Sequence, residues 1–311
     1  MTNPKISLVV PCFNEEDALP IFYEKANEVL TTMGLSGKAE FVFVDDGSKD
    51  NTLNILKELV EKDKSVHYLS FSRNFGKEAA LFAGLHKAQG DYIAVMDADL
   101  QDPPSLLPKM LEAIEKEGYD CAATRRSTRK NEPVIRSWFA RKFYKVMRKM
   151  SNVPVVDGAR DFRLMTKKYK EAVLSLDERN RFTKGIFPWV GFNTKWFEYE
   201  NVERVAGKSK WSFWKLFVYS IDGIVGFSTK PLYLSAFIGI FAIILAFISI
   251  LFLIIRKLLY GDPVQGWASS VCIIIFLGGI QLFTIGIMGI YMAKIYTEVK
   301  NRPLYIIREE A

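Results

Sequence analysis

Residues 92–104 read YIAVMDADLQDPP, and this run joins an apolar segment to a dense group of polar side chains. The segment from Tyr92 to Met96 is typical of a buried β-strand. Three aspartates and a glutamine follow it, and two prolines then precede a helical pattern. The order strand, polar turn, helix is the unit from which helix-covered sheets are built.

The same order recurs along the first part of the chain. The expected strands cover 5–11, 40–46, 66–72 and 91–97. The helices expected after them cover 16–33, 52–63, 77–88 and 104–117. Apolar strands that alternate with helices of this length predict an α/β fold with a Rossmann-like, mostly parallel sheet.

Polar side chains stand just beyond the carboxyl end of each expected strand. They are Asn14 and Glu15, Asp45 and Asp46, Arg73 and Asn74, and Asp97 and Asp99. Open α/β sheets bind their ligands at these strand ends. Because four strands carry polar groups to one edge of the sheet, we expect the functional site there.

The acidic turn after the fourth strand has the ligands of a hard metal ion. Asp97, Asp99 and Gln101 are spaced two residues apart, so in an extended segment their side chains can converge on one point. Two carboxylates at short range repel each other, and a divalent cation between them removes the repulsion. Oxygen donors of this kind hold Mg²⁺ or Mn²⁺ together with ligand phosphates. Asp102, before the prolines, is expected to cap a helix.

The segment VDDGSKDNT, residues 44–52, places two aspartates side by side at the end of the second strand. One of them can accept hydrogen bonds from a base or a ribose while the other orients the loop. Gly47 supplies a flexible backbone, and Ser48 or Asp50 can cap the following helix. The chain has no glycine-rich phosphate loop, which excludes dinucleotide dehydrogenases and P-loop enzymes.

Charge and composition narrow the expected partners. The 311 residues carry a net charge of +7 and contain 42 lysines and arginines. No nucleic-acid-binding motif is present, so anionic lipid and phosphorylated substrates are favoured over nucleic acid. Both histidines lack cysteine or carboxylate at ligand spacing, which argues against zinc. Three scattered cysteines do not form a disulfide framework, in agreement with a cytoplasmic domain.

Two long runs without a charged residue, 231–255 and 267–293, are each long enough to cross a bilayer. They predict a transmembrane hairpin that returns the C-terminal tail to the side of the large domain. Basic residues in the tail favour the cytoplasmic side for both. We therefore expect a multi-pass protein of the cell (inner) membrane, with its large domain in the cytoplasm.

Two further segments mix basic and aromatic residues as interfacial helices do, at 134–150 and 211–227. Either of them could instead cover the sheet. The expected divisions are a large domain, an interfacial helix, two spans and a tail, over 1–210, 211–228, 229–297 and 298–311. Small residues in the first span are explained equally by packing within the hairpin and by a homo-oligomer.

Six motifs together resemble glycosyltransferase family 2, in the branch of the polyprenyl-phosphate glycosyltransferases, which includes dolichyl-phosphate mannose synthases and the bactoprenol glucosyltransferase group. They are PCFNEE at 11–16, VDDGSKDNT at 44–52, SRNFGKEAALFAGL at 72–85, DADLQDPP at 97–104, DGARDFRLM at 157–165 and ERVAGKSKW at 203–211. The resemblance spans residues 5–300 and implies a GT-A fold for the large domain.

The resemblance also implies roles for single residues. Contacts to the nucleotide sugar would come from Pro11, Asn14, Glu15, Asp45, Asp46, Lys77, Asp97, Ala98 and Asp99. The metal, Mg²⁺ or Mn²⁺, would be held by Asp97, Asp99 and Gln101. The catalytic carboxylates would be Asp99 and Asp157. Asp161 remains an alternative to Asp157, because this chain has Arg160 and Asp161 where the family commonly has Ser and Gly.

Phosphate groups are expected to meet basic side chains. Because guanidinium groups match the geometry of a phosphate, Arg125, Arg136 and Arg163 are candidates for the acceptor phosphate. For Arg125 and Arg136 a purely surface role is equally compatible with the sequence. By resemblance, Arg204, Ser209 and Lys210 belong to a loop that closes over phosphates.

The implied reaction is an inverting transfer of one sugar, with UDP-glucose as the expected donor, to polyprenyl (undecaprenyl) phosphate for cell-envelope glycosylation. A processive polysaccharide synthase would carry a Gln-x-x-Arg-Trp motif and more spans, and the chain lacks that motif. A non-catalytic protein that binds lipid-linked sugars would not need the Asp-x-Asp set. Both remain alternatives, and the sugar and the base are indicated by the resemblance alone.

Overall fold

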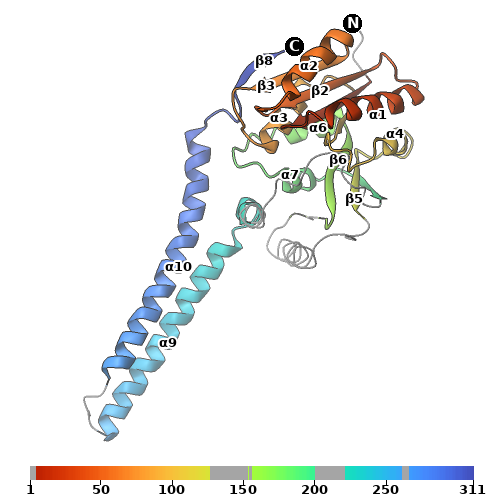
Figure 1. Cartoon of the computed structure of the whole chain (residues 1–311). Helices are drawn as coiled ribbons and strands as arrows, with labels where there is room; N and C mark the ends of the chain where they lie inside the picture. Colours follow the sequence, from red (N-terminus) through yellow and green to blue (C-terminus); the bar gives the residue numbers. More distant parts are fainter. Residues whose placement is uncertain (1–4, 127–152, 154–155, 200–220, 261–265) are drawn as a thin grey trace.

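The structure is a computed structural model of the chain and describes residues 5–126, 153, 156–199, 221–260 and 266–311. Figure 1 shows a domain of helices packed on a sheet, from which two long helices project as a hairpin. The predicted interfacial helix at 134–150 lies outside the described residues, as does the first part of the one at 211–227. Residues 221–227 are helical.

The described strands form one sheet with the order β7-β5-β6-β4-β1-β2-β3-β8. Their bounds are β1 Ile6–Cys12, β2 Ala39–Asp45, β3 Val66–Phe71, β4 Tyr92–Val95, β5 Cys121–Arg126, β6 Ala159–Thr166, β7 Thr194–Tyr199 and β8 Ile307–Glu310. Strands β1 to β4 are parallel, and β5 and β7 run in the same direction. Among the described strands, β6 and β8 alone run against their neighbours. The prediction of an α/β fold with a mostly parallel sheet is confirmed.

All four predicted helices of the first part of the chain are present. The described helices of the domain are α1 Leu19–Thr32, α2 Thr52–Lys62, α3 Lys77–Lys87, η1 Pro104–Leu106, α4 Leu107–Glu115, α6 Lys167–Leu174 and α7 Thr183–Trp189. The fourth predicted helix begins as the short 3-10 turn η1 and continues as α4. A proline within the first turn of each of these two elements suits this start, because the first helical N–H groups need no partner inside the helix.

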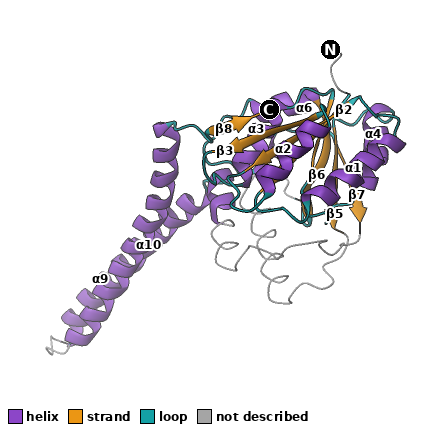
Figure 2. Cartoon of the chain, turned by 45° about the horizontal axis from the view of Figure 1, so that its top comes forward, coloured by secondary structure: helices purple, strands orange, loops and turns teal. Residues whose placement is uncertain are grey.

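Strand β1 shows why helices cover both faces of the sheet (Figure 2). Leu8 and Val10 pack in one core cluster with Phe22 of α1, whereas Val9 packs in a second cluster with Leu81 of α3. Side chains of a strand alternate between faces, so an apolar run needs cover on both. Burying a side chain as large as Phe22 contributes roughly 1.5–3 kcal/mol. With both faces filled, the ends of the strands are the part of the sheet left for binding.

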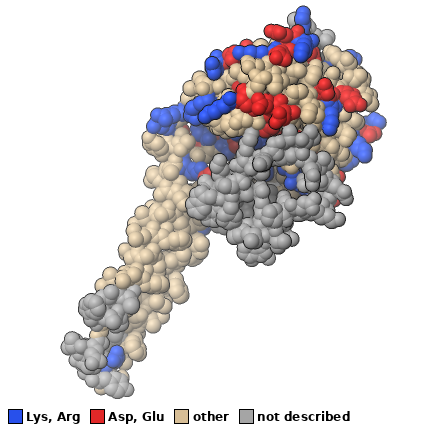
Figure 3. All heavy atoms as spheres, in the orientation of Figure 1, with Lys and Arg blue, Asp and Glu red and all other residues tan. Residues whose placement is uncertain are grey.

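Helices α9 (Lys230–Tyr260) and α10 (Trp267–Lys300) form the hairpin. Segments Lys230–Arg256 and Ile273–Lys300 are long and apolar enough to cross a membrane, and neither is buried within the protein. In Figure 3 the described surface of the hairpin is almost free of charged side chains, in contrast to the domain. Large apolar side chains that face outward along both helices indicate an apolar surrounding.

The end of the chain returns to the domain. Strand β8 pairs antiparallel with β3, with Leu69 opposite Glu310 and Ser70 opposite Glu309 (Figure 2). Helix α10 also continues to Lys300, beyond the predicted end of the second span. Residues 298–311 are therefore not a separate tail as expected, because they complete α10 and add an edge strand to the sheet.

Candidate active site

Loops after β1 and β2 are held together by hydrogen bonds. The backbone N–H of Asn14 donates to Oγ of Ser48 at 2.9 Å, and Oδ1 of Asn14 accepts from the N–H of Lys49 at 2.8 Å. The N–H of Glu15 donates to Oγ1 of Thr52 at 2.9 Å. The Asn-Glu pair predicted at the first strand end therefore lies beside the Asp-Asp loop of the second.

Asp46 connects the loop after β2 to the loop after β3. Its Oδ1 accepts hydrogen bonds from the N–H of Phe75 at 2.6 Å and of Gly76 at 3.1 Å. Gly47 permits this approach, since its φ is +67° and a Cβ there would lie 2.5 Å from the carbonyl carbon of Arg73. Burial raises the pKa of Asp46 to about 6, although the two backbone hydrogen bonds oppose that change.

Asp45 faces the interior of the domain. Its Oδ1 accepts from the N–H of Ser48 at 3.0 Å and its Oδ2 from the hydroxyl of Ser70 at 2.8 Å. The side chain is 1% exposed. Asp46 is nearly as buried, at 3% exposed, so the two neighbouring aspartates each hold a loop in place: Asp45 the loop after β2, and Asp46 the loop after β3.

Lys77, the first residue of α3, bridges two carboxylates from different strands. Its Nζ lies 2.6 Å from Oδ1 of Asp97, which follows β4, and 2.5 Å from Oδ2 of Asp161 in β6. Burial lowers the pKa of Lys77, but the two carboxylates more than offset this and hold it above its usual value. Burial likewise raises the pKa of Asp161, and the Lys77 ammonium offsets this to hold it below its usual range. Lys77 and Asp161 are therefore both charged near neutral pH.

Asp99 and Gln101 continue the turn after β4. Asp99 is buried, and its Oδ1 accepts from the N–H of Gln101 at 3.1 Å. Leu100 between them has a φ of +54°, a conformation that side chains other than glycine rarely adopt. The Oε1 of Gln101 accepts from Nη2 of Arg126 at 3.1 Å. We refer to Asp46, Lys77, Asp97, Asp99, Gln101 and Asp161 as the strand-end site.

The strand-end site has donors that suit a hard divalent cation, namely two carboxylates and an amide oxygen. Two of these donors already contact positive groups: Asp97 contacts the Lys77 ammonium, and Gln101 contacts the Arg126 guanidinium. Among the residues that the structure describes, no three His, Cys, Asp or Glu side chains are grouped as metal ligands. Two carboxylates and one amide are fewer oxygens than a six-coordinate cation takes, so a cation held there would need further ligands, such as the oxygens of a diphosphate.

Asp102 is not the predicted helix cap. The residue at the start of η1 is Pro103, and no side chain caps the turn. Asp102 is instead fully buried, where its Oδ1 lies 3.0 Å from Nε of Arg160 and accepts a hydrogen bond from the hydroxyl of Tyr199. A buried carboxylate needs such partners. The cap predicted for α2 also differs, since Asn51 occupies that position without a side-chain bond and Asp50 accepts from the N–H of Thr52.

The residues predicted to contact phosphate lie in different surroundings. Arg163 is 3% exposed, and its guanidinium stacks 3.4 Å from the ring centre of Phe187, so it is not placed to meet a phosphate at the surface. Arg163 and Asp161 are two residues apart in β6 and so project from the same face, but Arg163 lies deeper, packed on Phe187. Arg125 is partly exposed and forms an ion pair with Glu198. The others, Arg136, Arg204, Ser209 and Lys210, lie outside the described residues.

Asp157 and Asp161 differ in their surroundings. Asp157 lies in a turn just before β6 and is partly exposed, whereas Asp161 lies within β6 in contact with Lys77. Pro11 is partly exposed at the end of β1, and Ala98 is buried between Asp97 and Asp99. The structure therefore brings Lys77, Asp97 and Asp161 together.

Sequence reasoning missed two arginines near the acidic turn. Arg126 at the end of β5 contacts Gln101, and Arg160 in β6 contacts both Gln101 and Asp102. The pairing of β5 with β6, and of β6 with β4, carries them there. The basic residues of the TRR and GAR segments were a signal, but the antiparallel position of β6 was not evident from the sequence.

Known proteins with similar sequences are glycosyltransferases. The sequence profile described as Glycosyl transferase family 2 matches residues 7–174. The SfII prophage-derived bactoprenol glucosyl transferase of Shigella flexneri is 45% identical over 305 residues, which is 98% of this chain and 98% of that protein. The putative glycosyltransferase CsbB of Bacillus subtilis is 42% identical over 304 residues, 98% of this chain and 91% of that protein.

Solved structures resemble the domain more distantly. The mannosyltransferase PcManGT from Pyrobaculum calidifontis, in complex with GDP-Man and Mn²⁺, is 19% identical with a TM-score of 0.47. That similarity covers 72% of this chain and 63% of the mannosyltransferase chain.

Proposed function

The chain belongs to glycosyltransferase family 2, and we propose from this premise that it transfers one glucose unit from a nucleotide diphosphate sugar to polyprenyl phosphate at a membrane. UDP-glucose is the proposed donor and undecaprenyl phosphate the proposed acceptor. Transfer proceeds with inversion at the anomeric carbon. The product is a lipid-linked sugar for cell-envelope glycosylation.

The extent of the similarity carries this proposal. The family profile matches only residues 7–174, which lie in the domain. Similarity to the bactoprenol glucosyl transferase of Shigella flexneri extends over 98% of both chains, so it includes the hairpin of α9 and α10. A lipid acceptor explains why a transferase domain and a pair of long apolar helices occur in one chain, since the acceptor then stays in the bilayer during the reaction.

The strand-end site supplies the proposed contacts to the donor. Asp46 accepts a hydrogen bond from the nucleoside, while Asn14 and Glu15 form the adjoining loop. Asp97, Asp99 and Gln101 hold a divalent cation, either Mg²⁺ or Mn²⁺. That cation, when bound, stabilises the negative charge that develops on the departing diphosphate.

The acceptor needs positioning more than deprotonation. A phosphate monoester oxygen is already anionic near neutral pH, so a strong general base is not required. Asp157 and Asp161 are both candidates for orienting the acceptor or a sugar hydroxyl. The ion pair with Lys77 supports Asp161, since it keeps that carboxylate charged beside Asp97.

A transfer assay tests the proposal. Purified full-length protein is incubated with undecaprenyl phosphate, Mn²⁺ or Mg²⁺ and a panel of labelled nucleotide sugars, and the label extracted into organic solvent is counted. We expect UDP-glucose to label the lipid. The variant Asp99→Ala should lose at least about a hundredfold in rate, whereas Asp17→Ala, which changes an exposed aspartate, should not.

Two outcomes would count against the proposal. If no donor in a broad panel labels the lipid, the chain is not a transferase to polyprenyl phosphate. Full activity of Asp99→Ala would show that Asp99 is not needed to bind the metal, but it would not contradict the transfer reaction.

A further inference from the structure

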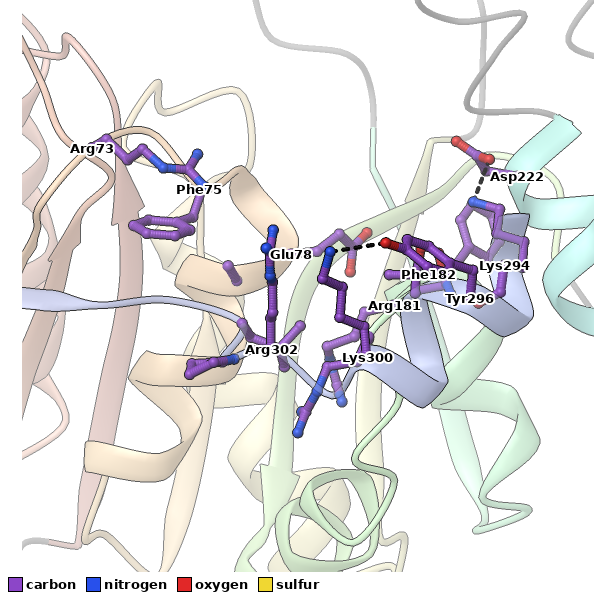
Figure 4. A pocket seen from close by; sticks show the side chains of 16 residues that line it. Arg73, Phe75, Glu78, Arg181, Phe182, Asp222, Lys294, Tyr296, Lys300 and Arg302 are labelled. Carbon is purple, nitrogen blue, oxygen red and sulfur yellow. Dashed lines mark hydrogen bonds and ion pairs between the residues drawn. The ribbon is translucent and has the colours of Figure 1, made fainter. Parts of the chain in front are cut away.

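A cavity of about 520 Å³ lies between the domain and the end of α10 (Figure 4). Its walls come from the loop between β3 and α3, the segment 179–182, the last turns of α10 and residues 302–304. Asp222 completes the lining. We call it the basic cavity. None of its lining residues belongs to the strand-end site, although Phe75 of the cavity donates its N–H to Asp46 of that site.

Positive charge dominates the basic cavity. Its basic residues are Arg73, Arg179, Arg181, Lys294, Lys300 and Arg302, and its acidic residues are Glu78 and Asp222. Both acids are engaged, since Asp222 lies 2.6 Å from Nζ of Lys294 and Glu78 accepts from the N–H of Thr183 at 2.9 Å. The two dashed contacts in Figure 4 are Lys294 with Asp222 and Lys300 with the Tyr296 hydroxyl.

Several of these cations have no counter-charge in contact. Within the part of the chain that the structure describes, Arg73, Arg181, Lys300 and Arg302 form no ion pair with a carboxylate. Figure 4 shows Arg302, Lys300 and Arg181 on neighbouring walls of the cavity. The six basic residues of the cavity outnumber its two acidic ones, so the basic groups repel one another, and an anion among them relieves the repulsion.

Two guanidinium groups also have an unused donor. The Nε atoms of Arg179 and Arg181 are buried and have no hydrogen-bond partner among the described residues. The Arg181 guanidinium donates a hydrogen bond to the carbonyl of Leu176. Burial nevertheless lowers the pKa of this guanidinium. Buried donors are nearly always paired in proteins, so an unpaired one indicates a missing acceptor. A phosphate offers several anionic acceptors and suits guanidinium groups.

The position of the cavity decides the source of the phosphate. One wall is formed by Lys294, Tyr296 and Lys300 in the last turns of α10, one of the two helices able to cross a membrane. Basic and aromatic side chains at such a helix end lie at the depth of lipid headgroups. We propose that the basic cavity binds the phosphate-bearing headgroup of an anionic membrane phospholipid, a site distinct from those that bind the donor and the polyprenyl acceptor.

The bound headgroup would strengthen the junction between the domain and α10. That junction already contains Glu298, which accepts from the N–H groups of Arg179 and Asn180 at 3.0 and 2.9 Å. The side chain of Arg179 also donates to Asn301. A phosphate that contacts Arg181 from the domain and Arg302 from beyond α10 would join the same two parts. The lipid thus fixes the orientation of the domain on the membrane.

The experiment measures lipid binding to full-length protein in a neutral detergent by native mass spectrometry. Phosphatidylglycerol is titrated against the unchanged protein, the double variant Arg73→Gln with Arg302→Gln, and the control Arg256→Gln near the far end of α9. Phosphatidylcholine and inorganic phosphate are titrated in parallel. Thermal unfolding without lipid verifies that each variant is folded.

We expect phosphatidylglycerol to bind at least about tenfold more tightly than phosphatidylcholine, and the double variant to lose about tenfold in affinity. Arg256→Gln should bind as the unchanged protein does. Equal binding by the double variant, or equal binding of the two lipids, would overturn the proposal. So would a variant-sensitive site for inorganic phosphate that ignores phosphatidylglycerol. A rise in KM for polyprenyl phosphate, with phosphatidylglycerol binding unchanged, would assign the cavity to the acceptor instead.

Discussion

The strand-end site and the basic cavity differ in their balance of acidic and basic side chains. In the strand-end site Lys77 is paired with Asp97 and Asp161, and the four carboxylates of the site outnumber this one basic group. In the basic cavity Arg181 and Arg302 have no carboxylate in contact among the described residues. A site with surplus acidic groups suits a ligand that brings its own cation, as a metal diphosphate does, whereas surplus positive charge calls for an anion. Substitutions at each site test whether this difference in charge determines which ligand binds there.

Lys77→Met should have the largest effect. It leaves Asp97 and Asp161 facing each other without the ammonium, which raises the pKa of one of them and disturbs the neighbouring acidic turn. We expect the transfer rate to fall by about a hundredfold or more. Lys87→Met, at the other end of α3, is the matched control and should stay close to the unchanged rate. A normal rate for Lys77→Met would mean that the charge balance of the strand-end site is irrelevant to transfer.

Gly47→Ala tests the contact between the loops after β2 and β3. Its Cβ would meet backbone atoms of Arg73 and Asn74 at 2.5 and 2.7 Å, in addition to the strain of a positive φ. We expect the free energy of unfolding to fall by about 2–3 kcal/mol, and by about 1 kcal/mol for Gly34→Ala, which has a similar φ but open space around it. Chemical unfolding in detergent, followed by circular dichroism, measures both. Equal losses would show that the close approach of the loops is not needed.

Asp46 should make donor binding depend on pH. Because its pKa is raised to about 6, the carboxylate is mostly protonated at pH 5 and mostly ionised at pH 7. If the ionised form accepts the hydrogen bond of the nucleoside, affinity for UDP-glucose rises about tenfold over this interval. Titration calorimetry at several pH values measures it. Asp46→Asn should remove this pH dependence, and a profile unchanged in the variant would exclude Asp46 as its origin.

The same group influences folding in the opposite direction. A carboxyl whose pKa is raised in the folded state binds more protons there than in the unfolded chain, between its ordinary value near 4 and about 6. The contribution of Asp46 to stability is therefore present below that interval and is lost as pH rises through it. Thermal unfolding between pH 4 and 7 should show this slope in the unchanged protein and a weaker one in Asp46→Asn.

Glu298→Gln should have the smallest effect, at the border of the basic cavity. The neutral amide weakens the hydrogen bonds from the N–H groups of Arg179 and Asn180, at a cost of about 1 kcal/mol or less because the site is exposed. Hydrogen exchange at these two amides should accelerate about fivefold. Glu61→Gln, which changes an exposed residue of α2, is the control and should leave the exchange rates of both amides unchanged. Unchanged rates in Glu298→Gln would show that the junction does not depend on this carboxylate.

The strand-end site was largely predictable because it depends on local pattern. Apolar runs of strand length that alternate with helices predicted the parallel sheet. In such a sheet the polar residues that follow each strand lie at the same edge. Asp46 and Asp97 follow from that rule, whereas Lys77, the first residue of α3, was included through the family resemblance alone. Asp161 was left as an alternative to Asp157, since the position of β6 between β4 and β5 depends on the whole fold.

The remaining features depend on contacts distant in sequence. Strand β8 pairs with β3 across more than two hundred residues, and nothing local in its sequence, IREE, marks it as an edge strand. The basic cavity likewise combines the loop after β3 with the end of α10. Arg163 was predicted to meet a phosphate because of its charge, yet packing buries it against Phe187. The burial of an arginine is decided by packing, which a single sequence does not specify.

Binding of Mn²⁺ followed by electron paramagnetic resonance tests the central claim most directly. With UDP-glucose present, the unchanged protein should reduce the signal of free Mn²⁺, and Asp99→Ala should reduce it far less. The control Asp17→Ala should behave as the unchanged protein. If Asp99→Ala bound Mn²⁺ and UDP-glucose as tightly as the unchanged protein, the strand-end site would not be where metal and diphosphate meet.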